Sequence, residues 1–396
     1  MAKYFDPRYV LRQMAKPLLR EFFRRRNELL DLPWDELKDA KDIEPIYAAW
    51  QRLPDDSRWQ VQVIFRDLAL LSDHRGLRAF AGEIQARAPH LAWQFAACRS
   101  NLNKALWFYL NFPDAFGQAS LFARADALST GRYAVRRNGL PKRPMIVTPA
   151  LIELLQKSLQ EHYWPNEMRG QSCRISHYSR PGGSEYFFAY LDDWPDMPLV
   201  FTDNGDLIPK IERYAFYVVF VACPADGSLE LIARGGPNVQ YSLQRRFCQV
   251  VYGLDIEPAD PLRPEYRLQH VLDPDFTYPT HPPDCIERVR LCRILLGAPD
   301  HELCVDGFQI FFKQDAWRGQ WLETINNSLQ SIHLSASETL VQEVTYQLFF
   351  KPAGCAPHTT MTFGLALPGW CDLKSKPDEL RIIGERCIQL WEMISA

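Results

Sequence analysis

Residues 173–190 read CRISHYSRPGGSEYFFAY, and this stretch decides the fold class. Side chains alternate in character before the Pro-Gly-Gly turn, and the aromatic run Tyr186–Tyr190 follows it. Two strand-like segments joined by glycine and proline predict a β-hairpin. The stretch therefore predicts an antiparallel sheet in the second half of the chain.

The residues that follow predict a second hairpin and a helix. A continuous apolar run over 215–222 leads into the turn 224–227, PADG, and 229–234 returns as a strand. Apolar residues then recur at a helical spacing through 239–252. We therefore expect residues 170–253 to form an antiparallel α+β unit.

The chain before this unit has the pattern of a helical domain. Asp6 followed by Pro7 is a typical helix start, because aspartate caps the first N–H groups and proline lacks one. Apolar residues recur at the helical period from Leu11 onward. Pro17 removes a backbone hydrogen bond, so the first helix should kink or restart there. Further helical patterns follow, and we expect a helical domain over residues 1–162.

The chain after residue 253 divides into a connector and a second unit. Residues 254–286 contain seven prolines and seven acidic residues, a composition typical of an extended connector. Residues 287–396 again combine strands, a hairpin and a final amphipathic helix. The predicted fold class is therefore α+β: an all-helical N-terminal domain followed by two α+β units built on antiparallel hairpins with packing helices.

Charge is divided unevenly along the chain. Residues 1–150 hold 24 Lys and Arg against 16 Asp and Glu, a net charge of +8. Residues 151–396 hold 21 against 32, a net charge of −11. A basic module joined to an acidic one predicts contact with a polyanion or an acidic partner.

Two basic stretches are the predicted binding surfaces. The first follows the N-terminal helix in steps of four residues, which places its side chains close together. The second is the acid-free segment 131–144, which glycine and proline mark as a loop and in which Tyr133 could stack on a base. The predicted nucleic-acid contacts are Arg8, Arg12, Lys16, Arg20, Arg24, Arg132, Arg136, Arg137, Lys142 and Arg143. The alternatives are a solvated helix face for the first stretch and a soluble interdomain linker for the second.

Four carboxylates are the catalytic candidates. Asp192 and Asp193 follow a predicted strand, whereas Asp226 and Glu230 flank a turn and its outgoing strand. A two-metal nuclease needs carboxylates that converge at such a strand end, usually with a lysine nearby. No lysine follows Glu230, and turns and strand ends collect acids for structural reasons.

Other catalytic and targeting signals do not appear in the sequence. The ten cysteines contain no Cys-x-x-Cys pair and read as buried small hydrophobes in a reducing compartment, so we predict neither a metal site nor a cofactor. We find no phosphate-binding loop and no Gly-x-Ser-x-Gly or His-Glu-x-x-His motif. Without an 18-residue apolar run or a signal-peptide pattern, we expect a cytoplasmic protein that does not contact membranes.

These features favour a non-enzymatic cytoplasmic binding or adaptor protein. Its basic N-terminal domain would contact nucleic acid or an acidic partner, and its acidic units would contact other proteins. One alternative is a metal-dependent nuclease or phosphodiester hydrolase that uses the four carboxylates. Another is a scaffold subunit of a larger bacterial complex. No motif ties the chain to a known family, and the sequence does not fix an oligomeric state.

Overall fold

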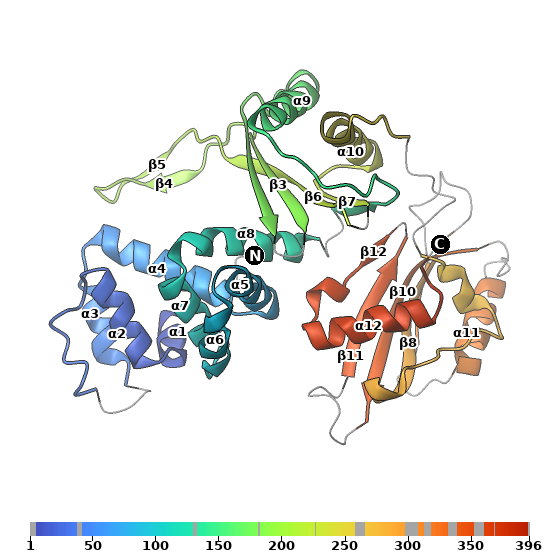
Figure 1. Ribbon diagram of the computed structural model, residues 1–396, viewed down its shortest axis with the longest axis horizontal. Coiled ribbons are helices and arrows are strands. Elements are labelled where there is room, and N and C mark those ends of the chain that lie inside the picture. The colour runs from blue at the N-terminus through green and yellow to red at the C-terminus, as the bar shows by residue number, and fades with distance from the viewer. Residues whose placement is uncertain are drawn as a thin grey trace. The chain divides into compact units, whose positions relative to one another are not determined.

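The chain has an α+β fold, as the sequence predicts. The computed structural model describes residues 5–37, 42–129, 133–180, 183–225, 227–257, 266–297, 308–312, 318–331, 339–351, 360–367 and 369–394. Contacts within the chain divide it into two units, residues 1–127 and 128–396 (Figure 1). The described part of the first unit is helical, and the described strands all belong to the second.

The N-terminal unit is organised around one central helix. Its helices are α1 (Pro7–Gln13), α2 (Lys16–Arg25), α3 (Glu44–Gln51), α4 (Asp55–Leu70), α5 (His74–Arg87), α6 (Ala92–Ala97), α7 (Asn101–Asn111) and α8 (Pro113–Leu128), with a 3-10 turn at Pro89–Leu91. Helix α7 contacts α1, α2, α4, α5 and α6. It buries Leu106, Phe108 and neighbouring apolar residues on several sides, as expected of a helix inside a bundle. Phe108 stacks on Phe80 of α5 with ring centroids 4.3 Å apart.

The first two helices start where the sequence predicts. The Asp6 side chain accepts hydrogen bonds from the backbone N–H groups of Arg8 and Tyr9, so it caps α1. Helix α1 ends at Gln13, and α2 begins at Lys16 with Pro17 in its first turn. Proline therefore restarts the helix here, because its missing N–H is harmless only at a helix start.

The first sheet of the second unit contains both hairpins predicted before residue 253. Among the described strands its order is β1 (Ala134–Arg137), β7 (Ser228–Ile232), β6 (Ala215–Cys223), β3 (Ser184–Asp192) and β2 (Cys173–Arg180), all antiparallel. Helices α9 (Pro149–Glu167) and α10 (Pro237–Tyr252) cover one face (Figure 1). Phe187 and Phe220 of the sheet meet Phe247 of α10 in a fully buried core, with the Phe220 and Phe247 ring centroids 4.7 Å apart.

Helix α9 belongs to this sheet and not to the N-terminal helical domain in which we expect it. Its Leu155, Leu159 and Tyr163 are buried in the core formed with the first sheet. Periodicity identifies a helix and its apolar face, but it does not say which core that face enters. Gly170 holds the turn from α9 into β2: its φ is +73°, and a Cβ there would lie 2.7 Å from Cβ of Tyr163.

The second sheet also has helices packed into one core. Its order over the described residues is β12 (Trp370–Cys371), β11 (Thr360–Ala366), β10 (Leu340–Phe350), β8 (Ile286–Gly297) and β9 (Phe308–Phe311). Helices α11 (Arg318–Ser331) and α12 (Asp378–Leu390) contribute to a core centred on Tyr346, Phe363 and Trp391. The predicted hairpin of β10 and β11 and the predicted final helix are confirmed. A strand that the sequence suggests at 303–305 lies outside the described residues.

The described part of the predicted connector holds short turns and one isolated β-bridge, between Tyr266 and Ile394. The turns are 3-10 turns at Leu268–Leu272 and Pro282–Asp284, and a similar turn, Leu373–Ser375, precedes α12. Leu268 and Val271 are buried in the core of the second sheet, so this part of the connector is packed and not free. Of the helices that the structure describes, none is long and apolar enough to cross a membrane.

A small hairpin projects from the first sheet between β3 and β6. It consists of β4 (Leu199–Phe201) and β5 (Leu207–Pro209), which pair in antiparallel register. We call residues 194–214, which contain this hairpin, the arm (Figure 1).

Candidate functional site

The division of the chain after Ala127 changes the charge argument. Residues 1–127 hold 19 basic and 16 acidic residues, a net charge of only +3. The five cations of segment 131–144 belong to the second unit, whose net charge becomes −6. The N-terminal unit by itself is therefore nearly balanced in charge.

Most basic residues of the first predicted surface are paired with groups of their own unit. Arg8 meets Glu44 at 3.1 Å, and Arg20 meets Asp35 at 2.8 Å. Lys16 donates to the backbone carbonyl of Leu37 at 2.7 Å. Since α1 and α2 are separate helices, the stretch is also not one continuous stripe.

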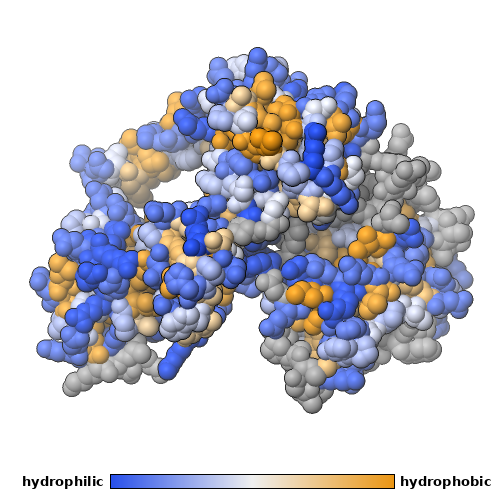
Figure 2. All heavy atoms as spheres, in the orientation of Figure 1, coloured by the Kyte–Doolittle hydropathy of each residue, from blue (hydrophilic) through white to orange (hydrophobic). Residues whose placement is uncertain are grey.

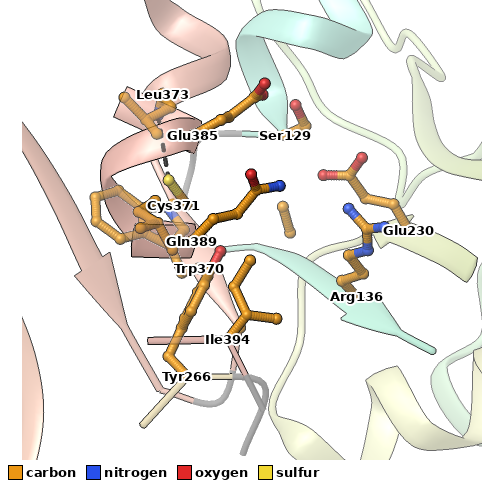
Figure 3. Close-up of a pocket in the computed structure, with 13 residues that line it drawn as sticks. Ser129, Arg136, Glu230, Tyr266, Trp370, Cys371, Leu373, Glu385, Gln389 and Ile394 are labelled. Atoms are coloured by element: carbon orange, nitrogen blue, oxygen red, sulfur yellow. Dashed lines mark hydrogen bonds between the residues drawn. The ribbon is translucent and has the colours of Figure 1, made fainter. Parts of the chain in front are cut away.

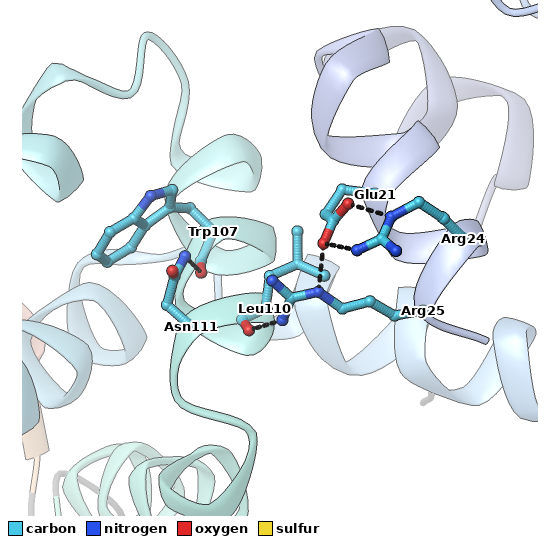
Figure 4. A network of polar contacts seen from close by, with 6 residues as sticks. All are labelled: Glu21, Arg24, Arg25, Trp107, Leu110 and Asn111. Carbon is cyan, nitrogen blue, oxygen red and sulfur yellow. Dashed lines mark hydrogen bonds and ion pairs between the residues drawn. The ribbon is translucent and has the colours of Figure 1, made fainter.

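Glu21 neutralises Arg24, a further predicted contact, together with the adjacent Arg25 (Figure 4). Its carboxylate accepts from Nε of Arg24 at 2.7 Å and from Nε of Arg25 at 2.6 Å. These two hydrogen bonds lower the pKa of Glu21 from 4.5 to about 2. Arg25 also donates to the carbonyl of Leu110, so it ties α2 to α7.

The second predicted surface is a loop only in part, because residues 134–137 form the edge strand β1 and residues 138–144 form neither helix nor strand. Strand β1 pairs with β7 and places Arg136 opposite Glu230. Arg137 donates to the Gln244 side chain at 3.2 Å and to the carbonyl of Glu257 at 2.9 Å. Burial lowers the pKa of the Arg137 guanidinium. This arginine therefore fastens β1 to the residues around α10.

The remaining cations of that segment differ from one another. Arg143 donates to the carbonyl of Tyr252 at 3.0 Å, which again joins the segment to α10. Arg132 lies outside the described residues. Of the ten predicted nucleic-acid contacts, only Arg12 and Lys142, within the described ranges, keep an exposed side chain with no partner.

The three candidate carboxylates that the structure describes do not converge on one site. Asp192 pairs with Ala215 at the start of β6, whereas Glu230 pairs with Val221 six residues further along. At about 3.3 Å per residue this separates them by roughly 20 Å. Asp226 lies outside the described residues. Among the residues that are described, no group of three His, Cys, Asp or Glu side chains is placed to hold a metal ion.

The neighbouring Asp193 has a structural role at the base of the arm. It accepts from Arg169 at 3.1 Å, and Glu167 pairs with the same arginine at 2.6 Å. The Arg169 guanidinium lies 4.3 Å from the ring centroids of both Trp194 and Phe216. Cation–π contact and two ion pairs thus fix the start of the arm to the first sheet.

Glu230 and Arg136 line a cavity of about 220 Å³ within the second unit (Figure 3). Glu385 and Gln389 reach it from α12. Burial raises the pKa of the Cys371 thiol in its wall to about 12, so that thiol stays protonated near neutral pH. The cavity is smaller than the roughly 300–1,000 Å³ typical of small-molecule sites.

In the described structure the arm differs from the other elements in being an ordered ribbon with many exposed apolar side chains. Its two strands extend the β3–β6 ladder, since Asp193 N–H donates to the carbonyl of Tyr214 and Asp196 bridges to Glu212. The pairing continues through Leu199 with Pro209 and Phe201 with Leu207. The arm is therefore an ordered two-stranded ribbon that ends in a turn at Thr202–Asp206.

One face of this ribbon is apolar and exposed. Residues that pair across two strands, and those two positions away, share a face. We call the face of the arm that contains Leu199 the apolar face. Its large side chains are exposed to the following fractions: Met197 (62%), Leu199 (65%), Phe201 (77%), Leu207 (51%) and Ile211 (71%). The opposite face carries Asp196, Asp206, Lys210 and Glu212 around one apolar pair, Val200 and Ile208, of which Ile208 is 42% exposed. Figure 2 shows hydrophobic side chains along the arm behind a hydrophilic tip.

The arm is not among the elements predicted above, although the sequence contains a signal for it. Residues 199–209 read LVFTDNGDLIP, in which Asn204-Gly205 lies between two apolar triplets. Asn-Gly between such segments is the strongest short-range indication of a hairpin. Gly205 has the positive φ, +83°, that this turn requires.

Comparison with protein-family models gave no match, and comparison with curated proteins gave none either.

Proposed function

We propose that this chain is a non-enzymatic binding or adaptor protein that contacts a protein surface through the arm. The apolar face of the arm carries this proposal. An isolated exposed apolar side chain is common, but a contiguous row on an ordered ribbon is typical of protein interaction sites. Phe201, with 77% of its surface exposed, lies near the tip of this row.

The arm is also well placed to recognise a partner without first having to fold. It is held at its base by Arg169, between Trp194 and Phe216, and by backbone pairing along its length. A preformed surface loses less conformational entropy on binding than a flexible loop does. This supports the arm as a recognition element of the adaptor.

Fewer observations support a nucleic-acid contact than support a protein contact through the arm. Arg8, Lys16, Arg20 and Arg24 have acid or carbonyl partners within the N-terminal unit, and surface charges that are already paired attract phosphate less. For this reason the proposal places the principal contact on the arm.

Site-specific photo-crosslinking in cells tests the proposal. Phe201 is replaced by p-benzoylphenylalanine in the full-length chain, and Ile146, which is 81% exposed, receives the same replacement as a matched control. We expect a discrete covalent adduct from position 201 that is absent from position 146. The adduct should disappear when Leu199→Asp is added.

An equal adduct pattern at positions 201 and 146 would contradict the proposal, because it would reflect random collision. So would the lack of any adduct at position 201 in a variant with wild-type expression and circular dichroism.

A further inference from the structure

The apolar face has an acidic residue at one end and a basic residue at the other, so two copies of it that run antiparallel have complementary charges. Going from tip to base, this face begins near Asp203, passes through the rows of Phe201, Leu199 and Met197, and ends near Arg213. The tip carries acid, the middle is uncharged, and the base carries a cation. Asp203 is exposed. Arg213 lies 3.5 Å from the Asp192 carboxylate of its own chain, a long contact that leaves 60% of the Arg213 side chain exposed to a second acid.

A twofold axis through the Leu199 row would exploit this order. Two arms related by that axis run antiparallel, so the Phe201 row of each copy meets the Met197 row of the other. The same rotation brings Asp203 of one copy to Arg213 of the other. No charged residue lies in the three middle rows, so such packing buries no unpaired charge there.

The exposed area is also of the size that a modest dimer needs. The five large side chains of the apolar face each expose on the order of 100 Å², since a large apolar or aromatic side chain buries at most roughly 150–250 Å². One face therefore offers on the order of 500 Å², and two offer on the order of 1,000 Å². Stable interfaces bury about 1,200–2,000 Å² in total, so contacts by the rim would complete a small interface.

From these observations we infer that the occupant of the apolar face is the arm of a second copy of this chain. This inference rests on the proposed function, whose protein contact it identifies. The charged face of each arm, with Asp196, Lys210 and Glu212, stays in water in this arrangement. The product is a closed dimer with two equivalent Asp203–Arg213 contacts at the rim.

Sedimentation equilibrium of the purified full-length protein from about 1 to 100 μM tests the inference. We expect the wild type to reach twice the chain mass within this range. Phe201→Glu should weaken association at least tenfold, because it places a carboxylate in the apolar contact. Thr202→Glu, the next residue but on the opposite face, is the matched control and should change association less than twofold.

A charge exchange gives a second and more specific readout. Asp203→Arg and Arg213→Asp should each weaken the dimer several-fold, whereas the double variant should recover most of the wild-type association. Circular dichroism of each variant checks that the fold is retained. Merely structural damage would not be repaired by the double variant.

Three results would overturn the inference. These are a wild type that stays monomeric to 100 μM, an equal effect of Phe201→Glu and Thr202→Glu, and no recovery in the double charge variant. A monomeric wild type that still gives an adduct with another protein from position 201 would overturn the dimer while leaving the proposed function in place. A monomer without any adduct would remove both.

Discussion

Helix α2 and the arm differ in whether their surface side chains are already in contact with groups of the same chain. In α2, acids from the same helix or from elsewhere in the N-terminal unit neutralise the arginines, as Glu21 does for Arg24 and Arg25 (Figure 4). In the arm, the large apolar side chains remain exposed along a whole face. A carboxylate can move to a guanidinium on the surface, whereas an apolar face is covered only by another surface.

This difference shows which sequence feature points to a partner. A run of cations is conspicuous in a sequence, yet each cation needs only one nearby acid to lose its attraction for a polyanion. A short apolar hairpin is inconspicuous, yet its exposed area persists until something packs on it. Substitutions in α2, in the arm and in the core of the first sheet should therefore have very different effects.

Replacing a buried and an exposed phenylalanine of the second unit should give very different results. Phe220→Ala empties a fully buried position in the first sheet and should lower the free energy of unfolding by about 3–5 kcal/mol. Phe201→Ala should change it by less than about 0.5 kcal/mol. Urea denaturation followed by circular dichroism, at protein concentrations too low for association, measures both. Similar losses would show that the arm is packed within the chain.

Arg24 and Arg25 share Glu21 but should differ in their importance for stability. Arg25→Ala leaves the carbonyl of Leu110 without its side-chain donor and should cost about 1–2 kcal/mol. Arg24→Ala removes only a surface ion pair and should leave the free energy of unfolding nearly unchanged. Thermal unfolding of the two variants provides the comparison. Equal losses would mean that Arg25 does not tie α2 to α7.

Glu21 should contribute stability that depends on pH. Because its pKa falls from 4.5 to about 2 in the folded chain, this contribution is present above pH 4.5 and is lost as the pH falls toward 2. The difference in unfolding free energy between wild type and Glu21→Gln should be about 0.5–1 kcal/mol at pH 7, a value discounted for its partly exposed position. It should approach zero near pH 2. Denaturation at pH 7, 4 and 2.5 measures it, and a difference independent of pH would be inconsistent with the ion pairs.

If the N-terminal unit binds nucleic acid, the same Glu21→Gln change should slightly increase that binding, because it removes the negative charge beside Arg24 and Arg25. We expect an affinity two to three times higher at low salt, and a salt slope steeper by up to about 0.9 for each cation that reaches a phosphate. Fluorescence anisotropy with a labelled single-stranded oligonucleotide, from 50 to 200 mM salt, detects this. Adding Arg24→Ala and Arg25→Ala should reverse the gain. An unchanged affinity would show that these cations do not face the nucleic acid even when they are free.

Most regular elements of the fold could be predicted from local pattern. The two hairpins of the first sheet, the restart at Pro17 and the final helix all follow from periodicity and from turn residues. Helix α8 has a weak helical pattern in the sequence, because its buried face is built largely of alanines, such as Ala115 and Ala119, and gives little hydrophobic contrast. Strand β1 was missed because only its pairing with β7 makes it a strand.

The candidate site was harder to predict, since it depends on distant contacts. Arg8 finds Glu44 at a separation of 36 residues, and Arg137 finds Gln244 at a separation of 107. The local composition of the sequence does not reveal pairs between residues so far apart, so the cations of the basic stretches look unpaired in the sequence. The arm is the opposite case, because its Asn204-Gly205 turn is local and could have been recognised.

The pairing of β1 with β7 also implies a delay during synthesis on the ribosome, because β1 is made well before its partner strand. Their partners lie 92 to 98 positions apart, as Arg137 does from Leu229 and Ala134 from Ile232. At about 5–20 residues per second, a nascent β1 waits about 5–20 s for its neighbour to emerge. During that interval the segment is unpaired, and its two arginines disfavour pairing with other unfinished chains, as charged side chains do on sheet edges. The arginines of β1 thus have two roles: they disfavour aggregation of the growing polypeptide, and later they form contacts that stabilise the finished sheet.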